Sequence, residues 1–499
     1  MSLARGERVD VIADARLTGA DRIDPFGTAA VDVHLTDGRI ADIAPVGALP
    51  RRGAVLDAGG SWLIPGLWDH HVHTVQWALE AQRVPLRQAE SAAHAAAVMG
   101  AAPVLGDGRR VGAGFRDALW PDEPDLATLD ETTGEVPTYL INADVHSVWL
   151  NSAALRREAM PVEGTGLLRE GPAFEISRRL NAVDSALADA AVFAALQDAA
   201  SRGVVGIVDL DMAWNAEAWN RRLAAGFDTT RISFGVYPPH LDRAIAEGLE
   251  TGDAIDPAGL VRMGPLKIIS DGSLGTRTAA CSHAYVGAPH NRGVLTVEPA
   301  ELIELMTRAT GGGLACAVHA IGDVAVTHAL DAFGLVAAHG TIEHAQLVAH
   351  ADLPRFARLG VGASVQPEHA LDDRDLSDME WAAQTARAYP LRALADAGAN
   401  LLFGSDAPVA PLEPWAAMAS AVHRTRDGRT AWHPEETLDA ATALAASTEG
   451  GSHAGSALEP GMTADLVVCE HDPLTATEQQ LRAMRIAATM IAGRLTHVG

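Results

Sequence analysis

Two histidines with metal-ligand spacing stand at the end of an apolar run near the N-terminus. The run at residues 61–73, SWLIPGLWDHHVH, ends in His71-Val72-His73. In a β-strand, residues i and i+2 lie on the same face, so both imidazoles would point the same way. Two such imidazoles are a common pair of zinc ligands. Two ordinary barrel histidines would give the same pattern, so the rest of the chain must decide between these interpretations.

Other residues that bind metals or exchange protons close further apolar runs. Lys267 lies in LKIISDG, His319 ends LACAVHA, His344 lies in GTIEHAQLV and Asp406 follows NLLFGS. A lysine inside an apolar run is rarely buried without a partner, so Lys267 either pairs with a carboxylate or is carboxylated and bridges two metal ions. The ordered set predicts one metal site, with the ligands His71, His73, Lys267, His319, His344 and Asp406.

These ligand types determine the chemistry that we expect. Neutral imidazole and carboxylate groups suit Zn²⁺, and Fe²⁺ or Mn²⁺ less well, so we expect one or two zinc ions. A bound divalent ion lowers the pKa of its water to about 7. Asp406 would take a proton from this water and pass it to a leaving amine, while the metal or His344 polarises the scissile carbonyl. The sequence therefore predicts an enzyme that hydrolyses a non-peptide C–N bond of a small molecule: an amide, formamide, imide or ureido group.

Two other classes of function stay open beside this hydrolase. One is a metal-barrel enzyme that isomerises or decarboxylates its substrate without adding water. The other is a non-catalytic scaffold that has kept the fold. The complete set of ligand types argues against a scaffold, because a scaffold is free to lose them.

Eight apolar runs must position the ligands. Most are continuously apolar, as strands buried on both faces are, and helical stretches lie between them. Eight such units predict an α/β protein with a (β/α)₈ TIM barrel, in which the C-terminal ends of the strands face the active site. The runs are residues 61–73, 203–211, 231–238, 260–272, 314–320, 340–348, 360–369 and 400–409.

The two ends of the chain alternate apolar and polar residues. Asp37-Gly38 separates two such runs and predicts a β-hairpin. Neither end is long enough to bury a core alone, so we expect residues 1–60 and 460–499 to form one composite β-sandwich domain. The barrel then spans residues 61–459.

Residues 75–183 do not follow the strand–helix rhythm. We interpret them as an insertion after the first barrel strand, covering the barrel mouth and containing a strand at 139–151. Four residues are weaker candidates for substrate binding, each with a purely structural alternative. Asp144 and His146 lie in the insertion, His369 follows the seventh run, and Arg277 would hold a substrate carboxylate bidentately.

Composition limits the partners of the protein. The 499 residues include 38 Lys and Arg against 64 Asp and Glu, a net charge of −26. Such a charge repels nucleic acids and anionic membranes. No apolar stretch reaches the ~18 residues of a membrane span, and no signal-peptide block precedes the first strand. Three dispersed cysteines indicate free thiols in a cytoplasmic protein. We expect a small-molecule substrate, and homo-oligomerisation stays open.

Motifs from about residue 55 to the C-terminus resemble the amidohydrolase superfamily. The similarity is specific to the amidohydrolase-3 branch, with YtcJ-like proteins and N-substituted formamide deformylases. It implies a metal-bearing (β/α)₈ barrel, a small β-sandwich built from both termini, and the same six metal ligands. The motifs are LIPGLWDHHVH, VHSVWLNSAAL, LKIISDGSLGTRTAA, VHAIGDVAVTHALDA, IEHAQLV, ASVQPEHA, GSDAPV and LEPGMTADLVV.

Overall fold

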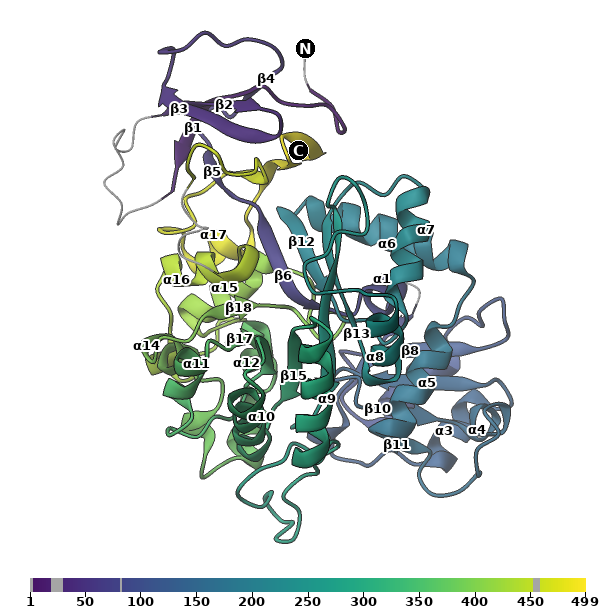
Figure 1. Ribbon diagram of the computed structural model, residues 1–499. Helices are drawn as coiled ribbons and strands as arrows, with labels where there is room; N and C mark the ends of the chain where they lie inside the picture. The colour runs from purple at the N-terminus through teal and green to yellow at the C-terminus, as the bar shows by residue number, and fades with distance from the viewer. Residues whose placement is uncertain (1–2, 19–29, 81–82, 452–457) are drawn as a thin grey trace.

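The fold has three parts: a sheet from the two ends of the chain, a central barrel and an inserted sheet. The computed structural model describes residues 3–18, 30–80, 83–451 and 458–499 (Figure 1). Within these ranges, no helix is long and apolar enough to cross a membrane.

Eight parallel strands form the barrel, each hydrogen-bonded to the next, and they match the eight predicted runs in order. A parallel bridge between Val72 and Ala407 brings the first and last strands together. The predicted (β/α)₈ architecture is thus confirmed. The strands are β6 (Leu67–Val72), β12 (Val204–Asp209), β13 (Arg231–Val236), β14 (Val261–Ile269), β15 (Cys316–Ala320), β16 (Gly340–His344), β17 (Gly362–Val365) and β18 (Leu401–Phe403).

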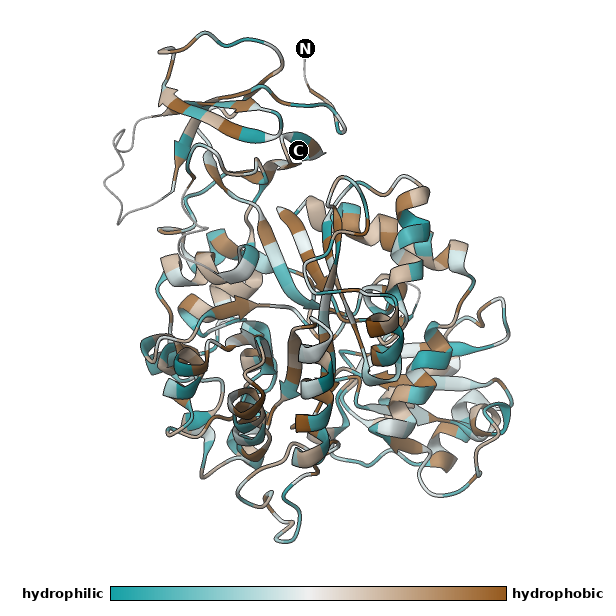
Figure 2. Ribbon diagram, in the orientation of Figure 1, coloured by the Kyte–Doolittle hydropathy of each residue, from teal (hydrophilic) through white to brown (hydrophobic). Residues whose placement is uncertain are grey.

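Helices surround the barrel because its strands are apolar on both faces. Strand residues such as Ile207, Phe234 and Val318 are fully buried in the largest apolar cluster. The helices carry both hydrophobic and hydrophilic residues, as expected of elements with one face toward solvent (Figure 2). They include α6 (Ser185–Ala200), α7 (Asn215–Ala224), α9 (Pro299–Gly311), α10 (Asp323–Val336), α11 (Leu353–Leu359) and α15 (Pro414–His423).

The prediction of one strand over residues 61–73 was wrong. β5 (Trp62–Pro65) belongs to the terminal sheet and β6 to the barrel. Between them, the Gly66 N–H donates to the carbonyl of Asp465, 2.8 Å away. A Cβ at Gly66 would lie 2.3 Å from Cγ2 of Val205, so only glycine fits where the chain passes between the two sheets.

Strands from both ends of the chain form one separate sheet, as predicted. Its order is β21-β20-β19-β5-β1-β2-β3, and β4 pairs with β1. The predicted hairpin turn is present, with positive φ at both Asp37 (51°) and Gly38 (76°), as a type I′ turn requires. The C-terminus lies beside the N-terminal strands (Figure 1). The strands are β1 (Val11–Leu17), β2 (Val31–Thr36), β3 (Arg39–Pro45), β4 (Val55–Asp57), β19 (Leu466–Cys469), β20 (Ile486–Ile491) and β21 (Arg494–Val498).

The insertion carries a sheet of its own, in the order β11-β10-β9-β8-β7. The single strand predicted at residues 139–151 is instead an antiparallel hairpin. Its turn holds Asp144 and His146, and the Asp144 carboxylate accepts a hydrogen bond from the His146 N–H at 3.0 Å. The strands are β7 (Val84–Pro85), β8 (Arg110–Phe115), β9 (Thr138–Asn142), β10 (Ser147–Leu150) and β11 (Leu167–Arg169).

Candidate metal centre

The imidazoles among the six predicted ligands gather at the C-terminal ends of the barrel strands. The ring centroids of His71 and His344 are 5.0 Å apart, and those of His319 and His344 are 4.5 Å apart. The His73 ring lies 5.5 Å from that of His71. Four histidines from three strands therefore form one cluster, where a barrel enzyme carries its active site.

Asp406 and Lys267 complete the cluster around His71. Oδ1 of Asp406 lies 3.3 Å from Nε2 of His71 and 3.2 Å from Nε2 of His73. Nζ of Lys267 lies 3.3 Å from the same His71 nitrogen, and Lys267 is only 1% exposed. Ligand atoms of His71, His344 and Asp406 lie within 4.8 Å of one another. The structure thus brings the predicted ligands together.

The protonation states of these groups fit a divalent cation. Burial lowers the pKa of His71 to about 4 and that of His344 well below its usual value. Burial would raise the pKa of Asp406, but the neighbouring histidines outweigh it and hold this pKa well below its usual range. Nδ1 of His344 is buried without a hydrogen-bond partner among the described residues. Neutral imidazoles beside an ionised carboxylate are the donors that zinc prefers.

Glu343 orients one ligand, and the sequence analysis did not identify it. Its Oε2 accepts a hydrogen bond from Nδ1 of His71 at 2.8 Å, and Thr341 donates to its other oxygen. Burial would raise the pKa of Glu343, but His71 and Lys267 outweigh it and lower this pKa to about 2. An ionised Glu343 keeps the proton of His71 on Nδ1 and leaves Nε2 free to bind a cation.

The backbone is strained at two of the predicted ligands. His344 has a φ of 74° and Asp406 a φ of 56°, both in the left-handed region that non-glycine residues rarely adopt. Such residues cost about 1–3 kcal/mol each and persist where the surroundings determine them. At Asp406 the constraint is visible, because its N–H donates to the carbonyl of His71 at 2.7 Å.

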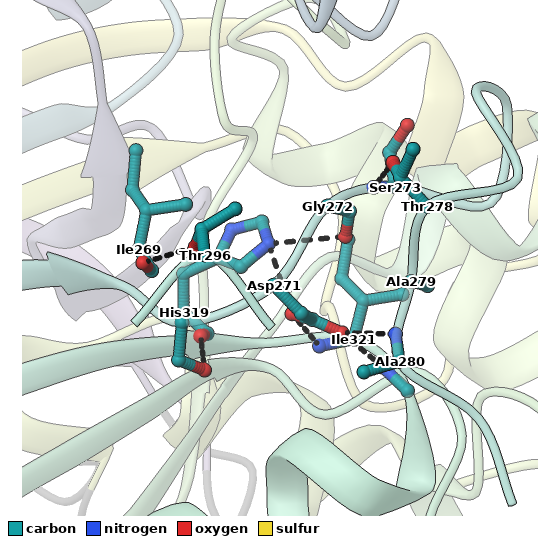
Figure 3. A network of polar contacts seen from close by, with 12 residues as sticks. Ile269, Asp271, Gly272, Ser273, Thr278, Ala279, Ala280, Thr296, His319 and Ile321 are labelled. Carbon is teal, nitrogen blue, oxygen red and sulfur yellow. Dashed lines mark hydrogen bonds and ion pairs between the residues drawn. The ribbon is translucent and has the colours of Figure 1, made fainter. Parts of the chain in front are cut away.

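A buried carboxylate fixes the loop beside His319 (Figure 3). Asp271 accepts hydrogen bonds from the backbone N–H groups of Ala280, Ile321 and Gly322 at 2.9–3.0 Å. Its Oδ1 lies 3.4 Å from Nε2 of His319. The carboxylate therefore joins the segment after β14 to the turn that follows β15, and β15 is the strand that carries His319.

A cavity opens above the cluster. His319, His344 and Asp406 lie in its floor, and the insertion supplies part of its wall. Three of the four predicted substrate contacts, Asp144, His146 and His369, line it. Arg277 is not among its described lining residues. Its guanidinium instead pairs with Glu380 at 2.6 Å, which is the structural alternative to binding a substrate carboxylate.

His146 is held in the cavity wall by a carboxylate that the sequence analysis also missed. Its Nδ1 donates to Oε2 of Glu170 at 2.9 Å, and its ring lies 5.5 Å from that of His319. Burial would lower the pKa of His146, but Glu170 outweighs it and raises this pKa to about 9. His146 therefore lies beside the candidate metal centre and is paired with Glu170.

Comparison with known proteins agrees with this architecture. The chain is 28% identical to Protein LONG AFTER FAR-RED 3 of Arabidopsis thaliana, over 97% of this chain and 91% of that protein. It is 25% identical to N-substituted formamide deformylase of Arthrobacter pascens, over 95% and 96% of the two chains. An uncharacterized metal-dependent hydrolase from Pyrococcus horikoshii OT3 shares the fold, with a TM-score of 0.79 and 24% identity over 94% of this chain and 99% of that one.

The family model described as "Amidohydrolase family" matches residues 54–497, which is most of the chain. The motifs at the strand ends and the cluster that they build fall within this match. The resemblance drawn from the sequence is thereby confirmed, and the chain belongs to the amidohydrolase family.

Proposed function

We propose that this protein is a metal-dependent hydrolase that cleaves a non-peptide C–N bond of a small molecule. The observation that carries the proposal is the position of Asp406. Its carboxylate lies in the cavity floor, within 3.3 Å of imidazole nitrogens of both His71 and His73. An ionised carboxylate beside a cluster of neutral imidazoles fits both metal binding and proton transfer.

The residues of the chain divide the work between them. His71, His73, Lys267, His319, His344 and Asp406 would hold one or two divalent ions. When bound, the ion acts as a Lewis acid toward a carbonyl oxygen and toward water. Asp406 takes a proton from the attacking water and gives it to the leaving nitrogen. Glu343 keeps His71 in the tautomer that binds a cation.

We propose zinc as the metal, because the donor set consists mainly of imidazole nitrogens together with a carboxylate. Lys267 is a candidate for carboxylation. Burial lowers its pKa, which favours the neutral amine that adds carbon dioxide. The relative from Arthrobacter pascens is named for removing formyl groups from N-substituted formamides, which supports a C–N bond as the target.

The experiment is a screen of N-acyl, formamide and cyclic imide compounds in H₂¹⁸O, with the wild type and an Asp406→Asn variant. We expect ¹⁸O in the acid product, and turnover about 10²–10⁴-fold lower in the variant, because general acid–base catalysis contributes about that factor. The matched control is Asp375→Asn, an exposed carboxylate that pairs with Arg429.

Two outcomes would refute this proposal. A product formed without ¹⁸O would favour an isomerase or a decarboxylase. Near-full turnover in an Asp406→Asn variant with normal metal content would remove Asp406 from proton transfer.

A further inference from the structure

The cavity wall away from the metal cluster is acidic. Its described lining residues include four carboxylates besides Asp406 and a single arginine, Arg116. The guanidinium of Arg116 is already engaged, because it pairs with Asp372 at 2.9 Å and reaches Asp373 at 4.0 Å. The four carboxylates are Asp117, Asp144, Asp372 and Asp373.

Two of these carboxylates form a pair that faces one partly exposed guanidinium and the imidazole of His146, which is itself paired with Glu170. Asn142 joins them: its side-chain amide donates to Asp117 at 2.7 Å, and its side-chain oxygen accepts from the Asp144 N–H at 3.1 Å. One carboxylate oxygen of Asp144 accepts a hydrogen bond from the neutral hydroxyl of Ser273. The nearest guanidinium to Asp117 is that of Arg169, 3.6 Å away and 42% exposed to solvent. Burial and the charge of Asp144 raise the pKa of Asp117, as expected where negative charge is not fully compensated.

Unpartnered polar atoms in another part of the cavity lining, beside His344, point to a ligand. Gln346 is 4% exposed and His369 is 5% exposed, and both line the cavity. Oε1 of Gln346 and Nε2 of His369 have no hydrogen-bond partner among the described residues. The Gln346 oxygen is an acceptor, and its burial without a partner is unfavourable, which a ligand with N–H donors would relieve.

An anionic ligand would find no comparable partner in the described lining. Arg116 is shared between two carboxylates, and the imidazole of His146 is paired with Glu170. Arg277, the residue expected to hold a substrate carboxylate, pairs with Glu380.

We infer that the cavity selects substrates whose non-reacting part carries a cationic, N–H-bearing group, such as an alkylammonium or guanidinium, held by Asp117 and Asp144. This inference rests on the proposed function, which places the scissile bond at the cluster of His319, His344 and Asp406. In this inference, residues of the insertion select the substrate, and residues of the barrel carry out the reaction.

The test is binding of matched probes that cannot be hydrolysed. N-alkyl methanesulfonamides with two to six methylenes are made with a terminal ammonium, methyl or carboxylate group. Each is titrated into the purified, metal-loaded protein by calorimetry. The ammonium series should bind about tenfold more tightly than the methyl series, and the carboxylate series most weakly, because opposite charges attract strongly in a partly buried site.

Substitution of the paired carboxylates locates the effect. Asp117→Asn and Asp144→Asn should each reduce the preference for ammonium over methyl at least about threefold. Two variants are used because Asp144 also accepts a hydrogen bond within the hairpin turn. The control Asp375→Asn removes an exposed carboxylate outside the described lining and should leave the preference unchanged.

Three outcomes would overturn the inference: methyl or carboxylate probes that bind as tightly as ammonium probes, no binding by any series at millimolar concentration, or an unchanged preference in both variants. The proposed function fails separately, through the ¹⁸O and metal measurements. A protein that prefers ammonium probes but hydrolyses no C–N bond would keep the inferred subsite and lose the proposed reaction.

Discussion

Oε2 of Glu343 lies 2.8 Å from Nδ1 of His71, and both side chains are almost completely buried. The contact joins the first barrel strand to the sixth across the interior. It assigns the proton of His71 to Nδ1 and directs Nε2 toward Lys267 and Asp406. A carboxylate in this position fixes the orientation of a metal-binding imidazole and increases its basicity.

Replacement of Glu343 by glutamine should therefore weaken metal binding. The amide has no charge to stabilise the proton on Nδ1, so we expect a loss of about 10–100-fold in metal affinity, the range found for such outer contacts. Competition with a chelating dye measures this affinity. The control is Glu380→Gln, which neutralises another buried glutamate that is paired with Arg277 away from the metal cluster. Equal metal affinities in the wild type and Glu343→Gln would show that Glu343 does not orient His71.

Gly404 allows the last strand to approach the first. A Cβ at this position would lie 2.7 Å from Cβ and 2.8 Å from N of His71, so an alanine forces the two strands apart. Gly404→Ala should lower metal occupancy and cost about 1–3 kcal/mol of stability, as overpacking does. The control is Gly334→Ala in α10, where the new Cβ meets Leu359 at an ordinary 3.5 Å. Elemental analysis and thermal unfolding report both effects, and wild-type metal occupancy in Gly404→Ala would contradict this account.

The terminal sheet contains an ion pair between a buried carboxylate and an exposed arginine, and the pH dependence of its contribution to stability can be predicted. Asp32 is fully buried and accepts two hydrogen bonds from Arg51, at 2.8 and 2.9 Å. Burial would raise the pKa of Asp32, but Arg51 and two backbone N–H groups outweigh it and lower this pKa to about 2. Because the folded pKa lies below the unfolded value of 3.8, the stabilisation is present above about pH 4 and is lost as pH falls through about 2.

Asp32→Asn should accordingly reduce the free energy of unfolding by about 1.5–3 kcal/mol at pH 7, the range for hydrogen bonds to charged groups. The difference from the wild type should shrink below about pH 4. Urea denaturation at several pH values measures it, with Asp42→Asn on the exposed part of the same sheet as the control. A difference that stays constant down to pH 2 would show that the charge of Asp32 does not stabilise the sheet.

The sequence predicted the barrel well because its strands carry a strong signal. Eight apolar runs gave the eight strands in order, and Asp37-Gly38 gave the hairpin turn. The boundary within residues 61–73 was missed because β5 and β6 are both apolar and only Gly66 separates them. The strand at 139–151 was wrong for a similar reason: the turn between β9 and β10 contains no glycine or proline.

The site was predicted less completely than the fold. Glu343 precedes His344, and strand alternation places two such neighbours on opposite faces. The left-handed backbone at His344, with a φ of 74°, breaks this alternation and brings both residues to the same cluster. The role of Gly404 could not be predicted from the sequence, because it depends on close contact with His71, 333 positions earlier in the chain. The pairing of Arg277 could not be predicted, because its partner Glu380 lies 103 positions away in the chain.

The central claim is that the clustered residues bind a metal ion that the reaction requires. The most direct measurement is elemental analysis of the purified wild type and of a His71→Ala/His73→Ala variant, combined with turnover before and after chelation. The account predicts stoichiometric metal in the wild type, strongly reduced metal in a folded variant, and turnover that disappears with the chelator and returns with zinc. A folded wild-type protein that stays free of metal after reconstitution, or whose turnover a chelator leaves unchanged, would contradict it.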